Sequence, residues 1–372
     1  MAHAPLDTPR PEDAAWMATC LRLARRGLGN AWPNPAVGCV VVREGRCVGR
    51  GWTQPGGRPH AETEALARAG AAARGATAYI SLEPCAHWGR TPPCTNALIE
   101  AGVGRVVTAI EDPDPRVAGG GHAQLRDAGI PVTENVLRAE AEWLNAGFFT
   151  RIRDGRPLVS LKLAQSLDGR IATARGESRW ITGAEARAVG HRLRAEHDAI
   201  LVGSRTARAD DPALTCRLAG LEDRSPVRVV VDGGATLAPD GRLAATAGEV
   251  ATWLLTREDR ATGALEAAGV RVFRLPGDAD GDVDLAAGLR ALAAEGVTRV
   301  LVEGGGGLAG ALAGRGLVDR VYAFAAGALI GGDGLPGVGG FGLEALADAP
   351  RFRHMHDLAC GPDRLQCWTR AD

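Results

Sequence analysis

The sequence is organised around one stretch, which begins at His60-Ala61-Glu62, continues to Glu83-Pro84-Cys85 and ends, after eight intervening residues, at Cys94. One imidazole and two thiols are ligands that zinc prefers, and a catalytic zinc keeps three protein ligands and an open position for water. Glu62 lies two residues from His60, close enough to handle protons without being a ligand. The stretch therefore predicts a catalytic zinc site held by His60, Cys85 and Cys94.

A structural zinc site is the alternative, because such sites usually have four protein ligands. His87, between the two cysteines, is the one obvious fourth ligand. The order His-x-Glu, then Pro-Cys and a second cysteine, is typical of zinc deaminases that act on nucleobases. In that chemistry zinc makes water nucleophilic at neutral pH, and a carboxylate carries protons from the water to the leaving amino group. Glu62 fits that role.

Around this stretch, strands and helices alternate, which favours a layered α/β fold. Asp13 is expected to cap the first helix. The elements expected after it are strands 36–42 and 46–52, helix 60–74, strand 76–82, helix 94–101, strand 105–110, helix 121–128, strand 130–136 and helix 139–149. The polar segment 151–157 contains Gly and Pro and is the expected linker between two domains, 1–150 and 151–372.

The second half repeats the alternation with different spacing. The elements expected there are strand 158–163, helix 183–196, strands 199–203, 227–232, 250–256 and 270–275, helix 286–295, strand 297–303, a helix ending near 314, strand 320–325 and a β pair over 352–368. Gly304–Gly307 follow a strand and open a helix, where backbone amides can hold a phosphate. A tight turn is the alternative interpretation of this glycine run, which is not the Gly-x-Gly-x-x-Gly fingerprint.

Composition limits the classes of function. The chain has 372 residues, a net charge of −1 and no long basic stripe, so we expect no nucleic-acid partner. No apolar run is long enough to span a membrane, and the start of the chain is not a signal peptide, so we expect a cytoplasmic protein. Eight cysteines do not indicate a disulfide framework. Those outside the zinc set are expected to be buried: Cys20, Cys39, Cys47, Cys216, Cys360 and Cys367.

Two motifs of the first half resemble the bifunctional riboflavin-biosynthesis deaminase–reductase family. They are Pro33-Asn34-Pro35-Ala36-Val37-Gly38 and the run from Glu83 to Cys94, which reads EPCAHWGRTPPC. Trp32 departs from the small residue or His that the family more often has. The resemblance implies that His87 contacts substrate, although a surface histidine is the alternative. Asn34 is a candidate contact to a pyrimidine edge, because an amide both donates and accepts, or else a turn residue.

Motifs of the second half resemble the reductase half of the same family. They are residues 162–170, 176–182, 208–215 and 302–305. The resemblance implies cofactor-site positions at Ala164, Trp180, Thr206, Asp210, Gly304, Gly305, Gly306 and Gly307. It implies substrate positions at Ser178, Arg194, Leu214, Arg217 and Glu303. Arg194 and Arg217 suit a sugar phosphate because guanidinium binds phosphate oxygens bidentately, although ordinary surface arginines are the alternative. Lys162 and Asp210 are the candidates for proton handling during hydride transfer.

The resemblance covers nearly the whole chain and implies one polypeptide with two enzymes. The fold it implies is a cytidine-deaminase-like three-layer domain followed by a dihydrofolate-reductase-like α/β domain. The first site would deaminate 2,5-diamino-6-(5-phosphoribosylamino)pyrimidin-4(3H)-one with Zn²⁺, and the second would reduce the ribosyl group of the product with NADPH. We expect small-molecule substrates and a homo-oligomer. A nucleic-acid-editing deaminase, which needs a basic channel, and a binding module with structural zinc are the rival hypotheses.

Overall fold

The computed structural model describes residues 8–89, 92–278 and 281–371. Arg90 and Thr91 of the cysteine motif, and most of the acidic start of the chain, lie outside these residues. The chain divides into two compact units, Met1–Gly155 and Arg156–Asp372, and each is described by itself. In the part described, no helix has the length and apolar character needed to cross a membrane.

The first unit is built on a five-stranded sheet with the order β2-β1-β3-β4-β5. Its strands are β1 (Gly38–Arg43), β2 (Arg46–Trp52), β3 (Thr77–Ile80), β4 (Arg105–Thr108) and β5 (Val132–Thr133). β1 pairs antiparallel with β2 and β3, whereas β3, β4 and β5 run parallel. The carboxyl ends of β3 and β4 therefore lie at the same edge of the sheet, where α/β proteins usually place their ligand sites.

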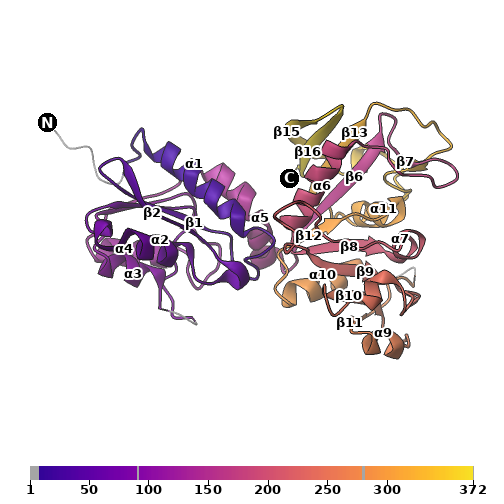
Figure 1. The fold of residues 1–372 in the computed structure, drawn as a ribbon, viewed down its shortest axis with the longest axis horizontal. Coiled ribbons are helices and arrows are strands. Elements are labelled where there is room, and N and C mark those ends of the chain that lie inside the picture. Colours follow the sequence, from indigo (N-terminus) through magenta and orange to yellow (C-terminus); the bar gives the residue numbers. More distant parts are fainter. Residues whose placement is uncertain (1–7, 90–91, 279–280, 372) are drawn as a thin grey trace. The chain divides into compact units, whose positions relative to one another are not determined.

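Helices cover both faces of this sheet and make a three-layer domain (Figure 1). They are α1 (Asp13–Ala24), α2 (Ala61–Ala69), α3 (Cys94–Glu100), α4 (Gly120–Asp127) and α5 (Arg138–Asp154). Two glycines allow close approach: a Cβ at Gly38 would lie 2.0 Å from the carbonyl oxygen of Cys20 in α1, and one at Gly49 would lie 2.2 Å from that of Ala65 in α2. The two helices thus pack directly on opposite faces of the β1–β2 ladder.

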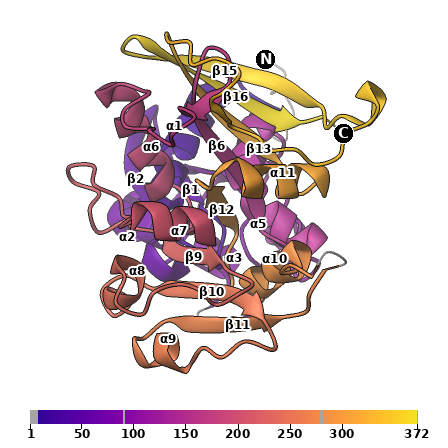
Figure 2. The ribbon, with the colours of Figure 1, turned by 90° about the vertical axis from the view of Figure 1, so that its right-hand side faces the viewer.

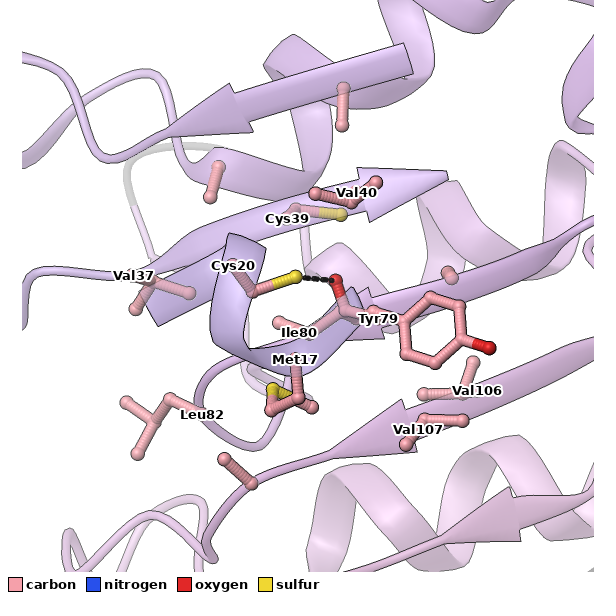
Figure 3. Packing of buried hydrophobic residues seen from close by; sticks show 14 of the residues in the cluster. Met17, Cys20, Val37, Cys39, Val40, Tyr79, Ile80, Leu82, Val106 and Val107 are labelled. Carbon is pink, nitrogen blue, oxygen red and sulfur yellow. Dashed lines mark hydrogen bonds between the residues drawn. The ribbon is translucent and has the colours of Figure 1, made fainter. Parts of the chain in front are cut away.

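The hydrophobic core of the first unit joins residues of the sheet with residues of α1, α2, α3, α4 and α5, and Figure 3 shows the part of it around α1. Met17 and Cys20 from α1 pack among strand residues such as Val40, and all three side chains are fully buried. The Cys20 thiol donates a hydrogen bond to the Tyr79 carbonyl at 3.2 Å. Cys20 therefore behaves as a small core residue, as expected for a buried free cysteine.

The second unit is built on a nine-stranded sheet with the order β11-β10-β9-β8-β12-β6-β13-β16-β15 (Figure 2). The strands are β6 (Leu158–Ser166), β8 (Ala199–Gly203), β9 (Val227–Val231), β10 (Thr252–Arg257), β11 (Arg271–Leu275), β12 (Arg299–Val302), β13 (Arg320–Ala326), β15 (Phe352–Cys360) and β16 (Asp363–Arg370). From β11 to β13 neighbouring strands pair in parallel, and β16 pairs antiparallel with both β13 and β15 at one edge. The central strands β8 and β12 are largely apolar, as parallel strands buried on both faces require, whereas β6 also carries Ser160 and Lys162.

The helices of this unit supply two further core clusters. They are α6 (Ala184–Ala195), α7 (Ser204–Asp210), α8 (Arg242–Ala245), α9 (Gly263–Ala267), α10 (Leu285–Ala294) and α11 (Gly306–Gly314). α6 packs through Leu193 on Tyr322 and Phe324 of β13. α7, α8 and α9 contribute to a second cluster with β8, β9 and β10. Two short strands, β7 (Arg170–Ala172) and β14 (Leu335–Pro336), form a separate two-stranded sheet.

Three expectations about local structure were wrong. The Asp13 side chain does not cap α1, because it accepts hydrogen bonds from Tyr79 Oη at 2.9 Å and Arg105 Nη2 at 2.8 Å. The expected linker 151–157 does contain the boundary between the two units, but 151–154 belong to α5, which ends at Asp154 and is followed by Gly155 in a left-handed conformation. Cys47 is exposed on β2 rather than buried, while the other cysteines outside the zinc set are buried as expected.

Candidate active sites

Three elements of the first unit bring His60, Cys85 and Cys94 together. His60 directly precedes α2, Cys85 follows β3, and Cys94 is the first residue of α3. His60 Nδ1 lies 3.2 Å from Cys94 Sγ and 3.7 Å from Cys85 Sγ. One ligand atom from each of the three residues lies within 4.8 Å of the others, so the set converges as a single metal ion requires.

The charges in this cluster also fit a metal. A hydrogen bond with Cys94 lowers the pKa of Cys85 to about 4, and the backbone N–H of Cys94 donates to Cys85 Sγ at 3.3 Å. A hydrogen bond between His60 and Cys85 raises the pKa of His60. The hydrogen bond between Cys94 and Cys85 raises the pKa of Cys94 well above its usual value. A thiolate and an imidazole crowded this closely are a donor set for zinc, which the chain would hold through His60 Nδ1, Cys85 Sγ and Cys94 Sγ.

Glu62 lies in the first turn of α2 and is buried. Burial raises the pKa of its carboxyl, against the attraction of His60, which lowers it. A carboxyl with a raised pKa both accepts and releases a proton more readily near neutral pH. Its position beside the cluster and its burial therefore suit a group that moves protons.

A cavity of about 270 Å³ opens onto this cluster. Its lining includes His60, Glu62 and Cys85 together with both predicted substrate contacts, Asn34 and His87. His87 Nδ1 is buried and has no hydrogen-bond partner among the described residues, which leaves it available to a ligand. Asn34 Nδ2 donates to the Gly57 carbonyl at 3.0 Å, so this side chain also fixes the loop before α2.

Sequence reasoning missed a second group of lining residues. Asp112, Asp114 and Arg116 follow β4, and Arg151 extends from α5. Burial raises the pKa of Asp112 to about 7, and Arg116 Nε pairs with Asp114 Oδ1 at 2.9 Å. The signal was present in the sequence: the polar run 111–116 directly follows an apolar strand, and β3, which precedes Cys85, runs parallel to β4.

In the second unit, Lys162, Arg194 and Glu303 form a compact ion cluster. Arg194 Nε and Nη2 lie 2.7 and 3.0 Å from the two oxygens of Glu303, and Lys162 Nζ lies 3.6 Å from Glu303 Oε2. Burial raises the pKa of Glu303, but the attraction of Arg194 and Lys162 together with the hydrogen bonds from Arg194 outweighs burial and lowers the pKa to about 2. Glu303 is therefore a permanent anion that orients both cations.

The predicted phosphate ligands Arg194 and Arg217 differ in their surroundings. Arg194 also donates to the Thr215 carbonyl at 2.9 Å, so three of its N–H groups are engaged within the protein. Arg217 is exposed, and its backbone N–H lies 3.2 Å from His191 Nδ1. Burial lowers the pKa of His191, and Arg194 and Arg217 add to that effect, so His191 lies in a positive environment. This environment suits an anionic group of a substrate.

The glycine run lies between β12 and α11, at the carboxyl end of a parallel strand. Gly305 N donates to Thr206 Oγ1 at 3.2 Å, which joins two of the predicted cofactor positions. A Cβ at Gly306 would lie 2.4 Å from the Pro336 carbonyl oxygen, so this glycine serves packing. A Cβ at Gly307 would meet open space. Backbone amides at the start of α11 fit a dinucleotide phosphate, which the glycine run 304–307 would hold beside Thr206.

The other predicted positions of the reductase half lie on separate elements. Ala164 is on β6 between Lys162 and the end of the strand, and Asp210 is the exposed last residue of α7. Trp180 is exposed, with the Arg187 guanidinium 4.5 Å from its ring centre. Ser178 is exposed in the same segment before α6, and Leu214 is buried with a positive φ of 53°.

Comparisons with known proteins agree with both halves. The family model described as "RibD C-terminal domain" matches residues 157–365, and "Cytidine and deoxycytidylate deaminase zinc-binding region" matches residues 10–110. "Riboflavin biosynthesis protein RibD" of Escherichia coli (strain K12) is 44% identical over 95% of this chain and 98% of its own length. The protein of the same name from Bacillus amyloliquefaciens is 41% identical over 94% of each chain.

Solved structures extend this similarity to the whole fold. Acinetobacter baumannii RibD, form 1, has a TM-score of 0.87 and 36% identity, covering 97% of this chain and 99% of that one. A deaminase/reductase from Thermotoga maritima has a TM-score of 0.84 and 34% identity, covering 96% and 99%. Such identity over nearly full length shows that the chain belongs to the RibD family, in which a zinc-dependent deaminase and an NADPH-dependent reductase of riboflavin biosynthesis share one polypeptide.

Proposed function

We propose that the chain carries out its two reactions with two separate sets of residues. The first unit hydrolyses the amino group of 2,5-diamino-6-(5-phosphoribosylamino)pyrimidin-4(3H)-one. The second reduces the ribosyl group of 5-amino-6-(5-phosphoribosylamino)uracil to ribityl with NADPH. The observation that carries the first assignment is the convergence of His60, Cys85 and Cys94 at a cavity that also contains the buried carboxyl of Glu62.

In the deaminase site, each residue has one proposed task. Zinc held by His60, Cys85 and Cys94 supplies the Lewis acidity that lowers the pKa of water to about 7. Glu62 takes a proton from the attacking water and delivers it to the departing amino nitrogen. Asn34 and His87 orient the pyrimidine. The hydrogen bond from Asn34 to Gly57 uses the amide nitrogen, which leaves the amide oxygen to accept from the substrate, and His87 offers a buried ring nitrogen that has no partner among the described residues.

In the reductase site, bound NADPH supplies the hydride. Gly304–Gly307, Ala164, Trp180, Thr206 and Asp210 are the proposed cofactor contacts, and Ser178, Arg194, Leu214, Arg217 and Glu303 are the proposed substrate contacts. Lys162 donates a proton to the ribose oxygen that gains charge, and Glu303 keeps that ammonium in place at 3.6 Å. Asp210 is the second proposed proton-handling group.

The decisive test is the variant Glu62→Gln in the full chain. The amide keeps the shape of the carboxyl but cannot carry a proton, so we expect ammonia release to fall about 10²–10⁴-fold. Zinc content and reduction of the already deaminated substrate should not change. Glu100→Gln, at the exposed end of α3, is the matched control and should deaminate normally. Near-normal ammonia release by Glu62→Gln would contradict the assignment.

The cytoplasmic location and the homo-oligomeric state expected from the sequence belong to the same proposal. Light scattering of the purified full chain measures the oligomeric state directly. A protein that is monomeric at micromolar concentration and carries out both reactions would overturn the proposed homo-oligomeric state.

A further inference from the structure

Glu83 is a buried acid next to the zinc site. Its side chain has no exposed surface, and it lies two residues before Cys85. Instead of a cation, it binds four backbone N–H groups of one segment. Oε1 accepts from Gly121 at 2.8 Å and from His122 at 3.2 Å, and Oε2 accepts from Gly119 at 3.0 Å and from Asp112 at 3.2 Å. One carboxylate thus holds both ends of residues 112–122.

A metal ion is the alternative explanation, since ligand atoms of Glu83, Glu111 and His122 lie within 4.8 Å of one another. Both oxygens of Glu83, however, face N–H hydrogens, whose positive ends would repel a cation. The ring of His122 is also occupied, because Nε2 lies 3.0 Å from Thr108 Oγ1 and Nδ1 lies 3.4 Å from Glu134 Oε2. The contacts therefore describe a carboxylate that binds its own chain.

The segment that Glu83 holds forms one wall of the deaminase cavity. Asp112, Asp114, Arg116 and Val117 line the cavity, and we call residues 112–117 the β4 wall. Within the wall, Asp114 N donates to Asp112 Oδ1 at 2.9 Å, so the two acids move together. Four residues after the wall, within the segment 112–122 that Glu83 binds, the contact is tight: a Cβ at Gly121 would lie 2.0 Å from the Pro84 carbonyl oxygen. The wall is thereby joined to the segment that carries Cys85.

We propose that Glu83 is a positioning residue that sets substrate affinity by holding the β4 wall at a fixed place beside the zinc site. This inference rests on the proposed deaminase function. The wall lies in the loop that follows β4, and Cys85 lies in the loop that follows the adjacent strand β3. The hydrogen bonds of the sheet fix the distance between the two loops only where they begin. Glu83 supplies that connection with four hydrogen bonds in a buried site, where charge-assisted bonds are strongest.

Glu83→Gln in the full chain tests the inference. The amide retains one acceptor oxygen and turns an NH₂ group toward N–H donors, so it loses about half of the bonds and adds a donor–donor contact. We expect the KM for the diaminopyrimidine to rise at least 10-fold while kcat falls much less. Zinc content should be unchanged, and reduction by the second unit of the same chain should be unchanged, which checks that the protein is intact.

Two further variants keep the test decisive. Glu111→Gln, exposed and adjacent to the wall, should keep the normal KM; an equal rise in both variants would favour a cation cluster and overturn the proposal. Glu83→Asp keeps the charge but is shorter, and is the variant to use if Glu83→Gln loses zinc. A normal KM in a zinc-loaded variant at position 83 would also overturn the proposal.

A double-mutant cycle separates positioning from a general structural effect. If Glu83 acts through the wall, then Glu83→Gln should raise KM much less in an Asp114→Ala background than in the normal chain, because interacting residues are not additive. Additive effects would overturn the proposal. If the unmodified chain releases no ammonia at all, the proposed function fails instead, so the two failures are distinguishable.

Discussion

Cys94 combines two functions at the level of a single residue. Its thiol completes the cluster with His60 and Cys85, and its backbone N–H supports the thiolate of Cys85 from the start of α3. The position of this residue as well as its type therefore suits a metal ligand, because its N–H group and its thiol both face Cys85 and His60. The sequence indicated this placement because Pro92-Pro93 precede an apolar helical segment.

We expect Cys94→Ser to lose zinc, because a hydroxyl is a far weaker zinc ligand than a thiolate. Metal analysis should show much less zinc in the purified variant than in the normal protein, for which the single site predicts about one ion per chain. Cys47→Ser is the matched control, since Cys47 is an exposed cysteine of the same unit. Full zinc content in Cys94→Ser would remove this residue from the ligand set.

Glu303 supplies the negative charge that balances the two cations of the second site. Its carboxylate is the shared partner of Arg194 and Lys162. Glu303→Gln would leave two positive groups near each other without an anion, and breaking a buried ion pair typically costs about 3–5 kcal/mol. We expect NADPH-dependent reduction to be abolished and the second unit to unfold at a lower denaturant concentration. Unaltered stability would show that solvent screens this pair.

The lowered pKa of Glu303 also predicts a pH dependence. A group whose pKa is lower in the folded state stabilises the fold above its usual value of 4.5, and this stabilisation is lost as pH falls toward about 2. The second unit should therefore lose stability between these values, as measured by denaturant unfolding at a series of pH values. Glu303→Gln should show a shallower slope, and an equal slope in both proteins would assign the effect to other acids.

At the scale of elements, α1 is attached to the sheet by a polar contact as well as by its apolar face. Asp13 Oδ1 and Oδ2 bind Arg105 Nη1 and Nη2 of β4 at 2.9 and 2.8 Å, and both side chains are almost completely buried. An acid at the start of an apolar helix usually indicates a cap, which is why the sequence predicted one. A partner 92 residues away leaves no local signal.

Asp13→Asn should destabilise the first unit, because Arg105 would keep its charge in a buried place without an anion. A loss of about 3–5 kcal/mol in the free energy of unfolding is the expected magnitude. Glu12→Gln, exposed and one residue earlier, should change it by less than about 0.5 kcal/mol. Equal stabilities of the two variants, measured by denaturant unfolding, would show that α1 is held by its apolar face alone.

Elements with strong apolar patterns were predicted well, whereas those without were missed. β2 and β8 have the bounds expected from the sequence. α7 was missed because Ser204–Asp210 bury little besides Ala207 and show no helical periodicity. β7 was missed because it is only a three-residue strand paired with β14, in a register that sequence does not specify. The end of α5 was placed too early because polar residues continue the helix to Asp154.

At the scale of the whole molecule, the cluster of His60, Cys85 and Cys94 with Glu62 beside it was predictable because these residues form one short stretch with a chemical order. The β4 wall was not, since its role depends on two parallel strands being neighbours. In the reductase half, the candidate site residues came from the resemblance of the sequence motifs to the family. The sharing of Glu303 between Arg194 and Lys162 joins residues up to 141 positions apart, from 162 to 303, and only the fold reveals it.

Each unit contains its own hydrophobic core, so the reductase half should fold without the deaminase half. One core cluster lies within residues 17–149, and two others lie within 186–367. A fragment should begin at Arg156 rather than Pro157, because Arg156 Nη2 pairs with Asp319 Oδ1 at 2.8 Å. Asp319 also accepts from the backbone N–H of Val159 at 2.8 Å, so this ion pair secures the first strand of the sheet.

We expect the fragment 156–372 to unfold cooperatively in the presence of a metal chelator, since all zinc ligands lie outside it. With NADPH it should reduce the deaminated ribosylamino-uracil phosphate, followed by the loss of NADPH absorbance and by mass spectrometry. The full chain carrying Glu62→Gln is the control, because it keeps both units while blocking the first reaction. If that full chain also fails to reduce the deaminated substrate, although zinc and folding are intact, the two sites are not independent. If only the fragment fails, the reductase unit depends on the first unit for its folded state rather than for its chemistry.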